Sequence, residues 1–100
     1  MIQLRVYGLA QVFYQEVKIL KMPVHLKYQL VRAAASITCN IAEGSGRSTR
    51  PDQRRFYVMA YASAKECTAV LSMAGVTSEV VLDRVDHLCA SLYKLTRVSL

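Results

Sequence analysis

QLVRAAASITCNIAEGSGR, residues 29–47, is an apolar helical pattern that carries polar side chains at regular spacing and reaches two glycines near its end. At about 100° per residue, the polar side chains fall within an arc of about 80°. They are Gln29, Arg32, Ser36, Asn40, Glu43 and, if the helix extends that far, Arg47. The run of alanines outside this arc lets another helix approach closely. The stretch therefore predicts a helix with a core face, a small-residue face and one narrow polar stripe.

The polar stripe, which we define as Gln29, Arg32, Ser36, Asn40 and Glu43, allows three interpretations. It is a hydrogen-bonded seam between helices or subunits, where each buried polar group must find a partner. It is a solvated helix face whose residues pair locally at three- and four-residue spacing. Or it is a catalytic or ligand site built on Glu43, although the stripe holds no second carboxylate, no histidine and no obvious nucleophile. We therefore interpret the stripe as structural.

Prolines and glycines divide the chain into four helical segments. Pro23 ends the first segment, Gly44, Gly46 and Pro51 bracket a loop, and Gly75 marks another break. No segment shows the sustained alternation of apolar and polar residues that indicates a half-buried strand. The sequence predicts a single all-α domain over residues 1–100, with helices at about 2–21, 25–44, 50–74 and 78–98.

The fourth segment carries the clearest packing signal. Its apolar residues repeat at spacings of four and three, a pattern typical of antiparallel helix packing, and they are Val81, Val85, Leu88, Leu92 and Leu95. Ser78 is predicted to cap the start of that helix. Thr49, with Asp52 three residues later, resembles a capping box at the start of the third helix.

The apolar content predicts that subunits associate. Hydrophobic residues make up 53% of the 100 residues, and the mean hydropathy is +0.21. After Arg55, the third segment is apolar almost all round. Because a small monomer offers little interior for such a helix, we expect part of this surface to be buried between copies of the chain, in a homo-oligomer.

The excess positive charge lies in the first half of the chain. Residues 1–55 hold nine basic and three acidic residues, whereas residues 56–100 hold four of each, so the first part accounts for the net charge of +6. Arginine forks suit phosphate groups. We therefore predict nucleic-acid-binding residues that contact the backbone without reading bases, namely Arg47, Arg50, Arg54 and Arg55. The alternatives are an ordinary solvated loop and a basic protein with no anionic partner.

Several kinds of site are not expected. Cys39, Cys67 and Cys89 form no CxxC pair, and neither His25 nor His87 completes a metal-ligand spacing, so we expect no metal and no cofactor. With no signal peptide and no uncharged run of ~18–20 residues, we expect a cytoplasmic protein without a membrane partner. Because no nucleophile–base pair is evident, we expect that it is not an enzyme.

Residues 29–47 also resemble the signature of the bacterial four-helix bundle family that includes the 23S rRNA intervening-sequence proteins. That signature reads roughly Q-x-x-R-A-A-x-S-I-x-x-N-I-A-E-G-x-G-R, and the chain matches each defined position. Comparable family residues elsewhere are VYGLA at 6–10, Pro23, Asp52, Arg55-Phe56, Ser63 and Glu66, so the resemblance covers nearly the whole chain. The chain departs from the family at Thr38, where proline is frequent, and at Gln53 and Arg54, where the third helix usually opens with apolar residues.

The resemblance implies an up-down four-helix bundle. The family is similar to the accessory protein of diversity-generating retroelements, which forms a pentameric ring and binds RNA and a reverse transcriptase. A ring-like homopentamer is therefore the expected assembly. The first function this implies is a non-enzymatic scaffold that binds nucleic acid, above all structured RNA, through a basic surface. The alternative is a protein-interaction module, or a retroelement-type accessory, that holds a partner protein such as a reverse transcriptase and has no direct nucleic-acid role.

Overall fold

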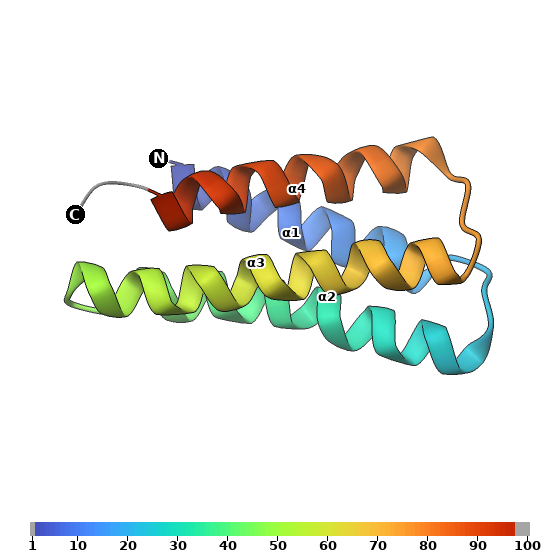
Figure 1. Cartoon of the computed structure of the whole chain (residues 1–100), viewed down its shortest axis with the longest axis horizontal. Coiled ribbons are helices and arrows are strands. Elements are labelled where there is room, and N and C mark those ends of the chain that lie inside the picture. The colour runs from blue at the N-terminus through green and yellow to red at the C-terminus, as the bar shows by residue number, and fades with distance from the viewer. Residues whose placement is uncertain (1, 98–100) are drawn as a thin grey trace.

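The computed structural model describes residues 2–97, which form four α-helices and no strand. The helices are α1 (Ile2–Lys18), α2 (Val24–Ser45), α3 (Arg50–Met73) and α4 (Glu79–Arg97). Figure 1 shows the α1–α2 and α3–α4 loops at one end of the molecule. The α2–α3 loop lies at the other end, together with the start of α1 and the end of α4 (Figure 1). The predicted all-α fold of four helices is confirmed.

Two helix ends differ from the sequence-based expectation. α1 ends at Lys18, three residues before its predicted end. The loop that follows is held by Lys27, whose Nζ donates a hydrogen bond of 2.5 Å to the carbonyl oxygen of Leu20. α2 runs through Gly44 to Ser45, so Gly44 does not stop the helix as its residue type suggested. Residue 98, included in the predicted fourth helix, lies outside the described residues.

The two predicted N-caps are formed. The Thr49 hydroxyl accepts a hydrogen bond from the backbone N–H of Asp52, and the Ser78 hydroxyl accepts one from Val81, each at 3.4 Å. The capping box is only half realised, because the Asp52 carboxylate contacts Arg47 of the loop and Arg55 of α3. These caps satisfy backbone donors that have no partner inside the helix.

Each helix packs against two neighbours, and one core lies between them. Among the described residues, α1 contacts α2 and α4, and α3 contacts the same two helices. The apolar seam predicted for α4 is buried along its whole length. Other core side chains with no exposed surface come from the remaining helices and include Phe13, Leu30, Ile37 and Leu71.

α2 and α3 approach closely where Gly44 meets Tyr57. A Cβ atom at Gly44 would lie 2.7 Å from Cε1 of the buried Tyr57 ring and 3.1 Å from the carbonyl oxygen of Gln53. Gly44 is itself buried and has ordinary helical neighbours on either side. The absence of a side chain at Gly44 therefore allows α2 and α3 to pack closely. This close packing positions the loop that follows.

Candidate nucleic-acid interface

The four predicted arginines lie around the short loop that joins α2 to α3. Gly46 caps α2 through its backbone N–H, which bonds the carbonyl oxygen of Glu43 at 3.2 Å. Gln53 donates from Nε2 to the carbonyl oxygen of Arg47 at 3.0 Å. The loop is thus tied to the first turn of α3, and it presents its arginines at one end of the bundle (Figure 1).

Arg47 and Arg55 share two neighbours, Phe56 and Asp52. Their guanidinium carbons lie 4.6 and 4.4 Å from the centre of the Phe56 ring, within cation–π distance. Arg55 Nη2 is 2.9 Å from Asp52 Oδ1, and Arg47 Nε is 3.7 Å from Asp52 Oδ2. Arg47 also pairs with Glu43 at 2.7 Å. Such partly exposed pairs add little stability one by one, but together they fix the guanidinium groups and offset part of their charge.

Arg54 is bound to a different helix. Its Nε donates a hydrogen bond of 2.7 Å to the carbonyl oxygen of Thr96, 42 residues away in sequence. That carbonyl lies in the last turn of α4, where carbonyl groups lack partners within the helix and a cation is favoured by the helix dipole. Arg54 therefore links the start of α3 to the end of α4. Arg50, the first residue of α3, is exposed.

Replacing Arg54 by methionine is expected to lower the free energy of unfolding by about 1 kcal/mol. Methionine keeps much of the aliphatic stem but removes the charged donor, whose bond is partly screened by water. Urea unfolding measures the loss. Arg55→Met is the matched control, because its acidic partner is three residues away on the same helix, and we expect a change below about 0.5 kcal/mol. Equal losses for both variants would contradict the role assigned to Arg54.

The fold also brings basic residues from the beginning and the end of the chain to this end of the bundle. Arg5 lies near the start of α1, and Lys94 and Arg97 lie in the last turn of α4 (Figure 1). Together with the four predicted arginines, they make seven basic side chains against two acidic ones, Glu43 and Asp52, or +5 of the net +6. We call the surface formed by these seven basic side chains the basic end.

Sequence reasoning missed Arg5 because it lies far from the arginine cluster in the sequence, and it missed Lys94 and Arg97 because residues 56–100 are neutral in sum. Their charges are separated along the bundle. Glu79 and Asp83 lie at the start of α4, at the opposite end of the molecule from Lys94 and Arg97 (Figure 1). The signal that could have found the missing residues is the pair of cations in the last predicted turn of the fourth helix.

The polar stripe lies along α2 where this helix faces α3. Ser36 Oγ is 2.9 Å from Ser63 Oγ on α3, and Asn40 Nδ2 donates to the carbonyl oxygen and the hydroxyl of Ser36 at 2.9 and 3.0 Å. Arg32 reaches Glu66 on α3 at 4.0 Å. The middle of the stripe is therefore a seam between two helices of one subunit. Its two ends, Gln29 and Glu43, are exposed, and Glu43 pairs locally with Arg47.

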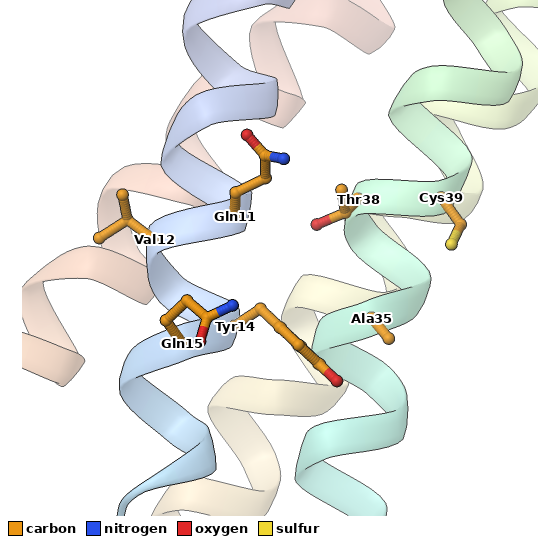
Figure 2. Close-up of a pocket in the computed structure, with 7 residues that line it drawn as sticks. All are labelled: Gln11, Val12, Tyr14, Gln15, Ala35, Thr38 and Cys39. Carbon is orange, nitrogen blue, oxygen red and sulfur yellow. The ribbon is translucent and has the colours of Figure 1, made fainter.

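A groove of about 380 Å³ runs between α1 and α2, as Figure 2 shows. No charged residue is among those that line it, which are Gln11, Val12, Tyr14, Gln15, Ala35, Thr38 and Cys39. Thr38 points toward α1 (Figure 2), and its buried hydroxyl has no hydrogen-bond partner within the described residues. An uncharged groove with one unsatisfied hydroxyl has the character of a contact surface, and neither a carboxylate nor a histidine lines it.

Buried titratable groups of the core are held in their neutral forms. Burial raises the pKa of the Cys67 thiol to about 12, with smaller contributions from Glu66 and Cys89, which keeps this thiol protonated at neutral pH. Burial likewise raises the pKa of the Tyr57 hydroxyl. Over the described residues, no three His, Cys, Asp or Glu side chains gather as metal ligands would. No helix in this part of the chain is both long and apolar enough to cross a membrane.

Comparison with known proteins gives one match. A family model described as 23S rRNA-intervening sequence protein matches the chain over residues 2–98, which is almost its full length. This match confirms the family resemblance of residues 29–47. No curated protein and no solved structure matches the chain.

Proposed function

Because the chain belongs to the family of 23S rRNA-intervening sequence proteins, we propose that it is a non-enzymatic scaffold that binds structured RNA through the basic end. The observation that carries this proposal is the concentration of +5 of the net +6 on one end of an elongated bundle. A surface of this kind attracts a polyanion over several ångströms and releases counterions when phosphates bind. The family name, which refers to ribosomal RNA, favours RNA among the polyanions.

The contacts within the basic end favour binding to the phosphate backbone. Arg55 is held by Phe56 and Asp52 yet remains exposed, and exposed Arg50 lies five residues earlier on the same helix. Fixed guanidinium forks lose little side-chain entropy when they bind phosphate. Of the aromatic rings near the basic arginines, Phe56 is buried against Arg47 and Arg55, whereas Tyr93 on α4 is 45% exposed and lies against Arg97. Positioning contacts to phosphate carry no sequence information, so the RNA would be recognised by shape.

The proposed scaffold is a homo-oligomer, a ring of antiparallel up-down bundles. Two separate surfaces, one uncharged and one apolar, support the proposal that copies of the chain associate. One is the α1–α2 groove, and the other is the outer face of α3, where Val58, Met59 and Met73 are 40, 42 and 64% exposed. Because the two surfaces lie on different helices, their mutual contact is heterologous and builds a ring when the rotation closes. We propose a pentamer because residues 29–47 also resemble the retroelement accessory protein, which forms a pentameric ring. Light scattering on the purified chain, compared with Met59→Lys, tests the assembly.

The RNA proposal is tested by titrating a labelled RNA hairpin with the protein at several salt concentrations. The slope of log affinity against log salt reports the number of phosphates neutralised, at about 0.7–0.9 for each contact. The double variant Arg50→Ala/Arg55→Ala is expected to weaken binding and to reduce the slope by about 1.4–1.8. Arg54 is left in place because it supports the fold.

The matched control removes two charges from the opposite end of the bundle. Lys18 ends α1 and Lys21 lies in the α1–α2 loop, so Lys18→Ala/Lys21→Ala lowers the net charge equally. We expect its salt slope to stay close to that of the unaltered chain. Binding that is absent at low salt, or equal losses for both double variants, would count against the basic end as the RNA surface.

A second candidate function is a protein-interaction module that holds a partner, such as a reverse transcriptase in a retroelement-type assembly. The observation that favours it is the exposed apolar face of α3, together with the partial neutralisation of the arginines by Glu43 and Asp52. Affinity purification from the native host with and without nuclease separates the two functions. A reverse transcriptase that stays bound after nuclease treatment supports this second function.

A further inference from the structure

A cleft between α1 and α4 forms a second concentration of positive charge within the basic end. Its volume is about 460 Å³, and its lining comes from one face of each helix, namely Arg5, Val6, Leu9, His87, Ser91 and Lys94. Small-molecule sites in proteins commonly measure about 300–1,000 Å³ and combine an apolar surface with a few polar groups. Here Val6 is buried and Leu9 is half-buried, while Arg5, His87 and Lys94 are exposed.

The basic side chains of this cleft have no acidic partner in the described part of the chain. No ion pair joins Arg5, His87 or Lys94 to a carboxylate there. The nearest acids along α4 are Asp83 and Asp86, and neither belongs to the cleft lining. The other basic side chain on the same side of α4, Arg84, is already paired with Glu16 at 2.8 Å. The positive charge of the cleft is therefore not balanced by a carboxylate, whereas the charge of Arg84 is balanced by Glu16.

Helix electrostatics do not account for this arrangement. Lys94 lies in the last turn of α4, where a cation is favoured by the helix dipole in any protein. Arg5, however, is the fourth residue of α1, close to the positive end of that helix, and the first turn holds no acidic residue. A cation at this position is unfavourable by itself. An anion in the cleft would offset this unfavourable charge, because Arg5 and Lys94 both line the cleft.

We propose that the α1–α4 cleft binds a phosphate monoester of nucleotide size, as a free nucleotide or as the 5′-terminal phosphate of an RNA. A monoester carries about −1.5 to −2 charges near pH 7, whereas a backbone phosphodiester carries one. Arg5 supplies a planar fork, Lys94 a point charge, and Ser91 a hydroxyl donor. The apolar surface of Val6 and Leu9 suits the adjoining sugar and base. The RNA form of this proposal rests on the proposed function, whereas the free-nucleotide form does not.

The test uses one hairpin RNA in two forms, with a 5′-monophosphate or a 5′-hydroxyl, each labelled at the 3′ end. At fixed salt, the full chain is expected to bind the monophosphate form about tenfold more tightly. Arg5→Gln and Lys94→Gln should each bring the ratio of the two affinities close to one, and this ratio is the readout because the loss of a charge from the basic end also weakens binding of both forms alike. Lys65→Gln is the matched control, because Lys65 is an exposed lysine on α3, away from the cleft, and it should keep the preference.

A second arm separates the two sources of the phosphate. Adenosine 5′-monophosphate and adenosine are titrated separately into the labelled protein, and backbone amide shifts are followed by NMR. Saturable shifts at residues 5–9 and 87–94 with the monophosphate, and none with adenosine, support the free-nucleotide form even if the chain binds no RNA. Equal affinity for the two hairpins together with no such shifts would overturn the cleft proposal, although RNA binding by the basic end would stand.

Discussion

Replacing Gly44 by alanine is expected to lower the free energy of unfolding by about 1–3 kcal/mol, although alanine is the better helix former. The added Cβ would lie 2.7 Å from Cε1 of Tyr57 and 3.1 Å from the backbone oxygen of Gln53. Neither group can move away easily, because the Tyr57 ring is buried and the oxygen belongs to a helix backbone. The added methyl group would therefore force α2 and α3 further apart at this contact.

Gly8 provides the matched control for Gly44. It also lies inside a helix, α1, but no atom lies within 4 Å of a Cβ built there. Gly8→Ala is expected to raise the free energy of unfolding by up to about 1 kcal/mol, because alanine loses less backbone entropy. Urea unfolding of both variants at one protein concentration gives the comparison. Stabilisation by Gly44→Ala of the size seen for Gly8→Ala would refute the close approach.

Replacing Phe13 by alanine is expected to lower the free energy of unfolding by about 3–5 kcal/mol. The Phe13 side chain has no exposed surface and lies among core residues of the bundle. Its truncation removes apolar burial and leaves a cavity. Since small domains have about 5–15 kcal/mol of stability in total, the variant stands close to the limit of folding. Phe13→Leu keeps most of the volume and should lose less than about 1.5 kcal/mol.

Val12, the neighbour of Phe13 on α1, points away from the core, so its truncation is expected to cost much less stability. Val12 is 45% exposed at the α1–α2 groove, so Val12→Ala should change the stability of the monomer by less than about 0.5 kcal/mol. Thermal and urea unfolding of the three variants measure the differences, again at equal protein concentration because assembly would shift the midpoint. A loss for Val12→Ala as large as that for Phe13→Ala would show that α1 is rotated from the orientation described.

The parts of the fold that could be predicted are those set by local periodicity and capping. The α4 seam from Val81 to Leu95 is buried as its spacing predicted, and the caps at Thr49 and Ser78 are formed. These features depend on residues three or four apart on one helix. A sequence shows such neighbours directly.

The parts that could not be predicted depend on contacts between helices. The residue type of Gly44 predicts a helix stop, whereas its role depends on the ring of Tyr57 on another helix. Arg54 was grouped with the loop arginines because its acceptor, Thr96, lies 42 residues away. The α1–α4 cleft was missed for the same reason, because Arg5 and Lys94 come from opposite ends of the chain.

The separation of charge along the bundle makes its two ends electrostatically independent. The molecule measures 40 Å along its longest axis and 21 and 18 Å across, while the Debye length at physiological ionic strength is about 8 Å. The potential of the basic end is therefore largely screened before it reaches the α1–α2 and α3–α4 loops. A polyanion would attract the basic end first. This attraction would orient the long axis of the bundle, with the basic end toward the polyanion, before any contact forms. The distal loops could be lengthened, labelled or fused without disturbing that encounter.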